Sequence, residues 1–166
     1  MTWPTKKLRE ICEIRMGETL IKKDLTGDGV PVYSADSLEK AWGYTSKNKL
    51  RFKKGAIIIG ARGTLGSVKL PNDEEFTSTQ TTIIINPQQL SINSSFLFYY
   101  LRIVDFKKFR GGSGIPMLTV NQLSDLEIPL PPLSIQQKIV DILDTIQEGV
   151  KTQEKIIGKT KELKKS

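Results

Sequence analysis

Two adjacent prolines, Pro131 and Pro132, divide this sequence into two parts that must fold differently. Proline has no backbone N–H and disfavours a helical conformation in the residue before it, so regular structure on its N-terminal side ends here. After Ser134, apolar residues recur at alternating three- and four-residue steps, which is the spacing of one face of a helix. The sequence therefore predicts a globular domain over residues 1–133 and one long helix over residues 134–166.

The predicted C-terminal helix is too long for a domain of this size to cover. Ser134 and Gln137 have the spacing of a capping box at its start, and at about 1.5 Å per residue the helix extends on the order of 50 Å. An exposed apolar seam along it implies a partner helix, whereas the alternative is a terminal helix that folds back onto its own domain. The seam residues expected to mediate dimerisation are Ile135, Ile139, Ile142, Leu143, Ile146, Val150, Ile156, Ile157 and Leu163.

Short β-branched runs separated by turn residues fill much of the N-terminal part. Val30–Tyr33 is expected to be an edge-like strand because Pro31 cannot donate a ladder hydrogen bond. Ala56–Ile59 and Thr81–Ile85 are typical of buried strands. Near Ser95 the period changes to that of an amphipathic helix. Its expected apolar face contains Phe96, Tyr99, Tyr100, Ile103 and Val104.

Two further segments have an unusual composition. If residues 47–53 are extended, four cations share one face, which suits either a polyanion or a solvent-facing strand. These cations are Lys47, Lys49, Arg51 and Lys53. The segment Gly60–Gly66 contains three glycines, which indicates tight turning or close backbone approach. It lacks the Gly-Lys-Ser/Thr ending of a phosphate-binding loop, which argues against a nucleotide site.

The residue types on which many enzymes rely are scarce. The chain has no histidine, and Cys12 is its single cysteine, so a Cys/His zinc site has too few ligands and Cys12 is most simply a small core residue. The acidic run Asp73–Glu75 lies in an expected hairpin loop, without the Glu-x-Lys strand pattern of magnesium nucleases. We therefore expect no catalytic residue, metal or cofactor. No run reaches the roughly 18 apolar residues that cross a bilayer, which predicts a soluble cytoplasmic protein.

The net charge of +7 is distributed unevenly. The balance of Lys and Arg over Asp and Glu is +6 in residues 1–63, −1 in residues 64–133 and +2 in residues 134–166. A concentrated excess of this kind is typical of a surface that binds a polyanion such as nucleic acid. The alternative is a solvated basic surface that maintains solubility.

Several short motifs follow one another in a characteristic order. In the N-terminal part they are Trp3-Pro4, Lys7-Leu8-Arg9-Glu10-Ile11, Gly17, Gly55-Ala56-Ile57-Ile58-Ile59, Arg62-Gly63-Thr64, Gly66 and Ser78-Thr79-Gln80. Around the prolines they are Leu123, Leu126, Ile128-Pro129-Leu130-Pro131-Pro132-Leu133, Gln136-Gln137-Lys138-Ile139 and Leu143-Asp144. In this order and spacing they resemble one half of the specificity subunit of type I restriction–modification systems, and the likeness covers essentially the whole chain.

The resemblance implies an α/β (α+β) fold, with an irregular, mostly β target-recognition domain that contains a few helices, followed by a long coiled-coil helix. In this family a full subunit has two such halves, whose helices pack antiparallel, and each domain reads half of a split DNA target. Methyltransferase (modification) subunits clasp this assembly and the restriction subunit joins later. This chain has one half, so it is either a half-subunit or a piece of a longer one. Both readings imply a homodimer through residues 134–166 on double-stranded DNA, with a two-fold axis that favours a palindromic split target.

DNA recognition needs phosphate contacts for affinity and base-edge contacts for sequence. The candidates for phosphate contact are Lys22, Lys23, Lys47, Lys49 and Arg51. For base edges, Arg62 can donate two hydrogen bonds to guanine and Gln80 can pair similarly with adenine. Thr79 and Ser113 suit either kind of contact. Trp42 and Tyr44 are aromatic residues in a polar stretch, where they contact the DNA groove or pack on the protein surface.

The sequence leaves three functions open. The first is a non-catalytic specificity subunit that directs modification and restriction subunits to their DNA target. The second is a stand-alone dimeric DNA-binding regulator with the same fold. The third is an interaction scaffold that acts through its C-terminal helix and whose basic surface is incidental.

Overall fold

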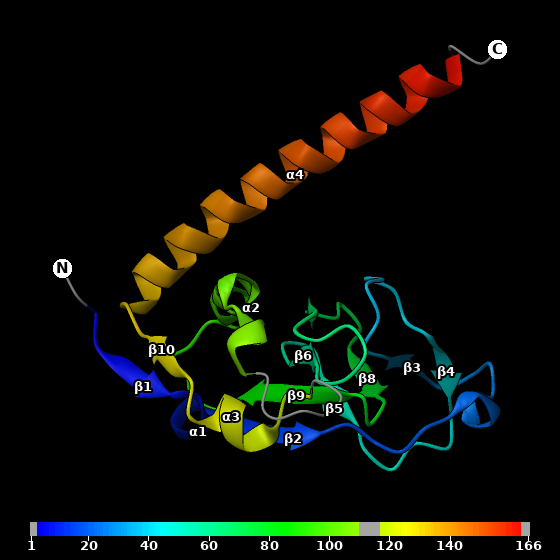
Figure 1. Cartoon of the computed structure of the whole chain (residues 1–166). Helices are drawn as coiled ribbons and strands as arrows, with labels where there is room; N and C mark the ends of the chain where they lie inside the picture. The colour runs from blue at the N-terminus through cyan, green and yellow to red at the C-terminus, as the bar shows by residue number, and fades with distance from the viewer. Residues whose placement is uncertain (1–2, 110–116, 164–166) are drawn as a thin grey trace.

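The computed structural model describes residues 3–109 and 117–163, which form an α+β domain with one long helix projecting from it (Figure 1). The fold class predicted from the sequence is thereby confirmed. In chain order the elements are β1 (Thr5–Lys7), α1 (Leu8–Ile11), β2 (Cys12–Met16), the 3₁₀ turn η1 (Lys22–Asp24), β3 (Val30–Tyr33), β4 (Gly43–Thr45), β5 (Phe52–Lys53), β6 (Ile57–Gly60), β7 (Val68–Lys69), β8 (Glu75–Ser78), β9 (Thr82–Pro87), α2 (Ser94–Ile103), the 3₁₀ turn η2 (Phe106–Phe109), α3 (Val120–Ser124), β10 (Glu127–Pro129) and α4 (Leu133–Leu163).

Two four-stranded sheets make up most of the domain, and the chain crosses repeatedly between them, the last time between β8 and β9. In the first sheet the strand order is β2-β9-β6-β7 and all neighbours are antiparallel. In the second sheet the order is β4-β3-β8-β5, with a parallel pair between β3 and β8. β1 pairs with β10, so the two ends of the domain meet where α4 begins (Figure 1).

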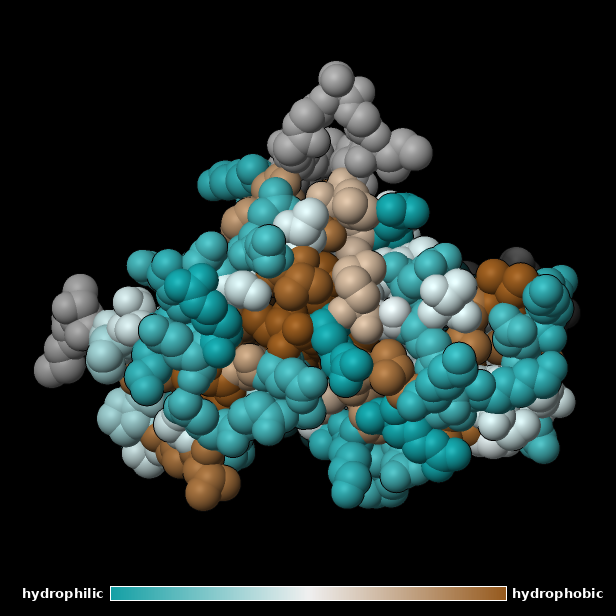
Figure 2. All heavy atoms as spheres, turned by 90° about the horizontal axis from the view of Figure 1, so that it is seen from below, coloured by the Kyte–Doolittle hydropathy of each residue, from teal (hydrophilic) through white to brown (hydrophobic). Residues whose placement is uncertain are grey.

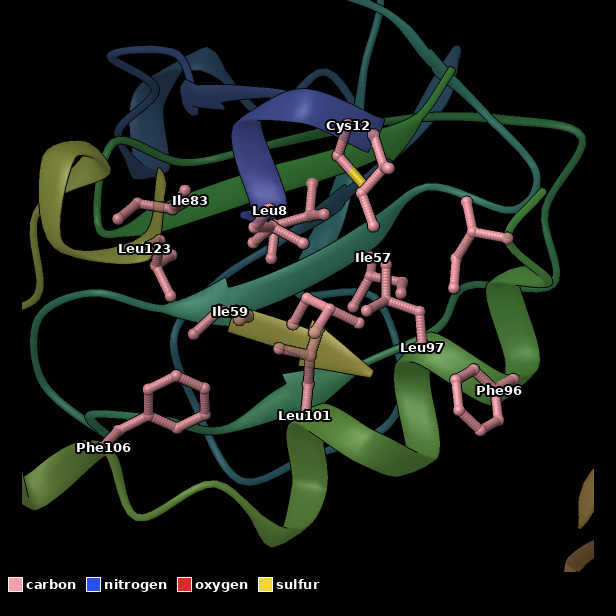
Figure 3. Packing of buried hydrophobic residues seen from close by; sticks show 14 of the residues in the cluster. Leu8, Cys12, Ile57, Ile59, Ile83, Phe96, Leu97, Leu101, Phe106 and Leu123 are labelled. Atoms are coloured by element: carbon pink, nitrogen blue, oxygen red, sulfur yellow. The ribbon is translucent and has the colours of Figure 1, made fainter. Parts of the chain in front are cut away.

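The isoleucine runs of β6 and β9 are buried on both faces of their sheet. One face belongs to the main core, which includes residues of α1, α2 and α3, and contains Ile57, Ile59, Ile83 and Ile85. The other face belongs to a second cluster around Phe76 and contains Ile58 and Ile84. Figure 3 shows α2 beneath this sheet, with Leu97 and Leu101 directed toward Ile57 and Ile59. Burial on both faces explains why these strands are apolar throughout instead of alternating.

Cys12, at the start of β2, is part of the main core and 5% exposed. Burial raises the pKa of its thiol to about 12. The thiol therefore stays protonated at neutral pH, and the reactive thiolate is disfavoured. Its interpretation as a small core residue is confirmed.

Two strand predictions are wrong in detail. β3 is not an edge strand, because it lies between β4 and β8. It tolerates Pro31 because its pairing with β8 begins at Val32, one residue after the proline. Within residues 47–53 only Phe52–Lys53 is a strand, so the predicted stripe of alternating cations does not form. The backbone N–H groups of Lys49 and Leu50 donate to a carboxylate, described below, instead of to a neighbouring strand.

Two helix predictions also need correction. The buried residues of α2 are Phe96, Leu97 and Leu101, whereas Ile103 is 80% exposed, because α2 packs against both the sheet and α4. α4 begins at Leu133, so Ser134 lies inside its first turn. The side chain of Gln137 accepts from Asn93 Nδ2 and donates to Asp141, and these bonds replace the predicted capping box.

One buried glutamine fixes the base of α4 to the domain. Gln136 has no exposed surface, and its Oε1 accepts from the backbone N–H of Asn93 at 2.8 Å. Its Nε2 donates to the carbonyls of Ser91 and Pro131, each at 2.9 Å. One turn further on, Val140 is 4% exposed. The sequence does not predict these contacts, because a glutamine within a helical hydrophobic pattern is expected to lie on the exposed face.

Past this base, α4 leaves the domain (Figure 1). The helix has 31 residues, which corresponds to about 46 Å. From Lys151 onward every residue whose burial is described is exposed. α4 therefore does not fold back onto the domain, and the predicted projecting helix is confirmed.

We predict that Gln136→Leu lowers the free energy of unfolding by about 2–4 kcal/mol, because one N–H and two carbonyls lose their partner inside the protein. The matched control is Gln137→Leu, whose hydrogen bonds are exposed, and it should lower the free energy of unfolding by less than about 1 kcal/mol. Urea unfolding at a fixed protein concentration measures both. Equal losses in the two variants would contradict the anchoring role of Gln136.

Candidate nucleic-acid interface

The turn between β8 and β9 places Gln80 on the surface. Thr82 N donates to the carbonyl of Thr79 at 3.0 Å, which closes the turn. Gln80 is exposed at its tip, and its Oε1 accepts from Thr19 Oγ1 at 3.0 Å. Within residues 3–109 and 117–163 no acceptor binds the amide nitrogen of Gln80, so this group can donate a hydrogen bond outward from the surface.

Arg62 lies on the adjacent turn, which follows β6. The backbone N–H groups of Ala61 and Arg62 both donate to the carbonyl of Thr81, at 2.8 and 3.1 Å. This pair of bonds joins the turn of Arg62 to the turn of Gln80. The Arg62 side chain is exposed, and its Nη2 lies 3.1 Å from Met117 Sδ. The two strongest candidates for base contact are thus brought together from positions far apart in the sequence.

The glycines of this turn serve its own tight packing. A Cβ on Gly60 would lie 2.2 Å from the carbonyl oxygen of Thr64, and a Cβ on Gly66 would lie 2.9 Å from the Phe106 side chain. Gly66 also has a φ of +77°, a conformation that favours glycine. The prediction of tight turning is therefore confirmed, with the protein's own atoms as the close neighbours.

The basic loop that precedes β5 is held by Glu18. The two carboxylate oxygens of Glu18 lie 2.8 and 2.9 Å from Lys49 N, and one of them lies 2.8 Å from Leu50 N. Glu18 itself donates its backbone N–H to the carbonyl of Ser78, next to the turn of Gln80. The carboxylate therefore fixes the loop of Lys47 and Lys49 beside the turn of Gln80.

The remaining basic candidates flank this loop. Arg51 is exposed and its Nη1 lies 3.1 Å from Glu75 Oε2, a surface ion pair of low strength. Lys22 and Lys23 are exposed on η1. Thr45 Oγ1 donates to the carbonyl of Asp24 at 2.7 Å, which ties η1 to β4. Two aromatic side chains lie on the surface in and beside β4. Trp42 is 39% exposed and Tyr44 is 48% exposed.

One predicted contact residue is buried, and another lies outside the described residues. Thr79 is 4% exposed and its Oγ1 lies 2.7 Å from Thr81 Oγ1. Its hydroxyl faces the protein, so a direct DNA contact by Thr79 does not agree with this geometry. The Ser-Thr-Gln pattern carries no signal that separates a buried hydroxyl from an exposed one. Ser113 lies outside the described residues.

A series of exposed apolar residues runs along α4. Six of its large apolar residues are more than half exposed, namely Ile142, Ile146, Val150, Ile156, Ile157 and Leu163. Ile135, Ile139 and Leu143 are half-buried, because they lie at the base of the helix near the domain. By contrast, the side of the domain that faces away from α4 is largely hydrophilic around a central apolar area (Figure 2). The predicted seam is therefore present and open along the projecting part of the helix.

A cleft of about 400 Å³ lies where α2 and α4 face the connection from β7 to β8. Tyr99 donates to Asp144 here, and burial, then this hydrogen bond, raise the pKa of Tyr99 to about 12. On the opposite wall, Tyr33 donates to Asp73 at 2.7 Å, and burial followed by this bond raises the pKa of Tyr33. Both phenols stay protonated at neutral pH and act as structural donors between elements, not as acid–base groups.

Other candidate sites receive no support from the described ranges. Among residues 3–109 and 117–163, no three metal-ligating side chains of the His, Cys, Asp and Glu types are grouped in space. In the same ranges, none of the helices combines the length and the apolar character that a bilayer crossing requires.

Comparison with known proteins identifies a common family. Residues 1–163 match the family described as the type I restriction modification DNA specificity domain. A type I restriction enzyme MjaIX specificity subunit from Methanocaldococcus jannaschii is 28% identical over 180 residues, which cover 95% of this chain and 41% of that protein.

Solved structures give the same result. A chain from a type I R-M system, studied for complex assembly and conformational transition, has a TM-score of 0.78 at 25% identity and covers 95% of this chain and 41% of its own length. The HsdS subunit from Thermoanaerobacter tengcongensis has a TM-score of 0.72 at 26% identity, over 90% of this chain and 38% of its own. This chain spans 46% and 32% of the length of two putative type I specificity subunits, from Mycoplasma pneumoniae and Haemophilus influenzae.

We predict that Glu18→Gln speeds amide hydrogen exchange at Lys49 and Leu50 by about tenfold, because charge-assisted bonds are roughly twice as strong as neutral ones. The matched control is Glu13→Gln, which removes an exposed carboxylate on β2 that lies 3.6 Å from Arg15 Nη1. It should leave both amides unchanged. Hydrogen exchange resolved to single amides measures the effect, and equal rates in the wild type and Glu18→Gln would show that Glu18 does not hold the loop.

Proposed function

Because this chain belongs to the family of type I restriction modification DNA specificity domains, we propose that it is the sequence-reading, non-catalytic part of a type I restriction–modification enzyme. In this role it binds double-stranded DNA and directs a modification subunit, and through it a restriction subunit, to a split target. Reading and chemistry are then carried by different chains.

The observation that carries this proposal is the joining of two turns through the carbonyl of Thr81. It places Arg62 and Gln80 side by side, on rigid turns at the end of two paired strands. An arginine and an amide side chain are the residue types that read guanine and adenine with paired hydrogen bonds. The basic loop held by Glu18 supplies cations beside them, which suits contact with the phosphates that flank the bases.

The C-terminal helix suits pairing with the same helix of a second chain. Gly149 lies midway between Ile135 and Leu163 in the sequence. In an antiparallel pair centred on Gly149, Ile142 of one helix faces Ile156 of the other. Such a pair buries the exposed seam and gives the dimer a two-fold axis. Each domain then reads one half of the target, and the two halves of a palindromic split sequence are equivalent.

The DNA-contact predictions separate base reading from phosphate binding. Arg62→Ala and Gln80→Ala should each weaken binding to the target by about 5- to 150-fold and relax specificity at one base pair. Lys47→Ala and Lys49→Ala should weaken binding to all sequences and lower the slope of log K against log salt by about 1 each. The matched control is Lys155→Ala, an exposed cation on α4.

The measurement needs the target first. Methylated sites are mapped in cells that carry this protein and its modification subunit, and fluorescence anisotropy with that sequence and a scrambled one follows at several salt concentrations. Equal losses on both sequences for Arg62→Ala would contradict base reading. Absence of co-purification with the modification subunit, together with specific DNA binding, would favour a stand-alone regulator.

The helix-seam model predicts that Ile142→Glu combined with Ile146→Glu yields monomers, because each change places a charge inside the paired seam. Both residues are more than half exposed, so the domain itself should stay folded. Lys155→Glu, at an exposed position on the opposite face of the same helix and with the same change of two charges, is the control and should leave the dimer intact. Sedimentation velocity measures the mass, and a dimer that persists in the double variant would refute the seam as its interface.

A further inference from the structure

A buried lysine is connected, through one short segment, to the turns that carry Arg62 and Gln80. Lys69, on β7, is 6% exposed, although lysine is among the residue types least often buried. Its Nζ lies 2.6 Å from Asp36 Oδ1 and 2.8 Å from the carbonyl oxygen of Ser34. Removing a lysine ammonium from water is costly unless it is paired. Both of its partners belong to one short segment, Ser34–Asp36, which follows β3.

That segment contacts both turns of the candidate interface. The carbonyl of Ala35 accepts from Thr64 N at 3.3 Å, on the turn that carries Arg62. The backbone N–H of Ala35 donates to Thr81 Oγ1 at 3.4 Å, on the turn that carries Gln80. Ser34 Oγ also accepts from Thr79 Oγ1 at 3.4 Å. These are long hydrogen bonds, so their geometry depends on what holds Ser34–Asp36 in place.

Lys69 binds this segment at two points, Asp36 Oδ1 and the carbonyl of Ser34. Asp36 keeps a side-chain exposure of 32%, while the Lys69 side chain is 5% exposed. The partly buried ion pair therefore joins the segment to a strand of the core sheet. A buried ion pair adds little net stability compared with an apolar pair of the same shape, and its better-attested effect is to select one arrangement.

We propose that Lys69 is a positioning residue for DNA recognition. It does not touch DNA, but fixes Ser34–Asp36, which sets the relative position of the Arg62 and Gln80 turns. This inference rests on the proposed function and extends it to a residue outside the reading surface. In this arrangement Thr79 joins the Gln80 turn to Ser34 through its hydroxyl.

The test compares Lys69→Met with Lys54→Met. Both changes remove one positive charge, but Lys54 is an exposed residue, 3.4 Å from Glu74. In the free protein, Lys69→Met should speed amide exchange about tenfold in the held segment and the two turns, at residues 33–38, 61–66 and Thr82. The exchange rates in the strands behind them, at Ile57–Ile59 and Ile83–Ile85, should change by less than about twofold. Lys54→Met should change none of these. Asp36→Ala, at the partly exposed end of the pair, should affect the same amides if Lys69→Met folds poorly.

The functional readout is the pattern of DNA methylation in cells that carry the modification subunit. For Lys69→Met, the ratio of methylation at the target to methylation at one-base variants should fall by about tenfold. Faster exchange throughout β6 and β9 would overturn the inference, because it would show a general structural role. An unchanged methylation pattern would overturn it as well. Wild-type protein that directs no methylation would instead refute the proposed function.

Discussion

The register between β6 and β9 determines the rest of the domain. Gly60 lies opposite Thr82, so the end of β6 coincides with the start of β9, and the turns that carry Arg62 and Gln80 emerge at the same point. Three consecutive isoleucines in each strand cannot fix this register by themselves, because a slip by one residue replaces isoleucine with isoleucine. Gly60 supplies the missing constraint, since a Cβ there would lie 2.2 Å from the Thr64 carbonyl oxygen and 2.5 Å from Ser67 Oγ. The Thr82 hydroxyl adds to it with a 2.7 Å bond to the Thr79 carbonyl.

The parts of the fold that could be predicted from sequence are those decided by local pattern. β-branched runs predicted β6 and β9, and helical spacing predicted α4, because burial of apolar side chains dominates both. Whether residues 47–51 are extended is left open by the sequence, because the backbone partners of this loop come from Glu18, about thirty residues earlier. A contact of this kind leaves no trace in local composition. The burial of Thr79 has a similar origin, since it follows from contacts with Tyr33 and Ser34, which lie far from it in the sequence.

At the candidate site the sequence predicts which residue types can contact DNA, whereas their arrangement follows from the fold. Arg62 and Gln80 are candidates because of their hydrogen-bonding chemistry, and the register of β6 and β9 brings their turns together. Lys69 and Gln136 were missed, because a polar side chain inside the protein is recognised from its partners alone. Both lie where two structural units meet: Lys69 between sheet and surface segment, and Gln136 between domain and helix.

Because α4 is attached to the domain at one end only, a small change of angle at its base displaces its far end by several ångströms. Its base is held by the three hydrogen bonds around Gln136 and, two turns further on, by the bonds from Tyr99 to Asp144 and Gln147. About 24 Å of the helix extends beyond these contacts. A tilt of about 8° there moves the far end by roughly 3.4 Å, which equals the rise of one base pair. In the proposed dimer, the contacts at the base of α4 therefore decide how far apart the two half-sites lie.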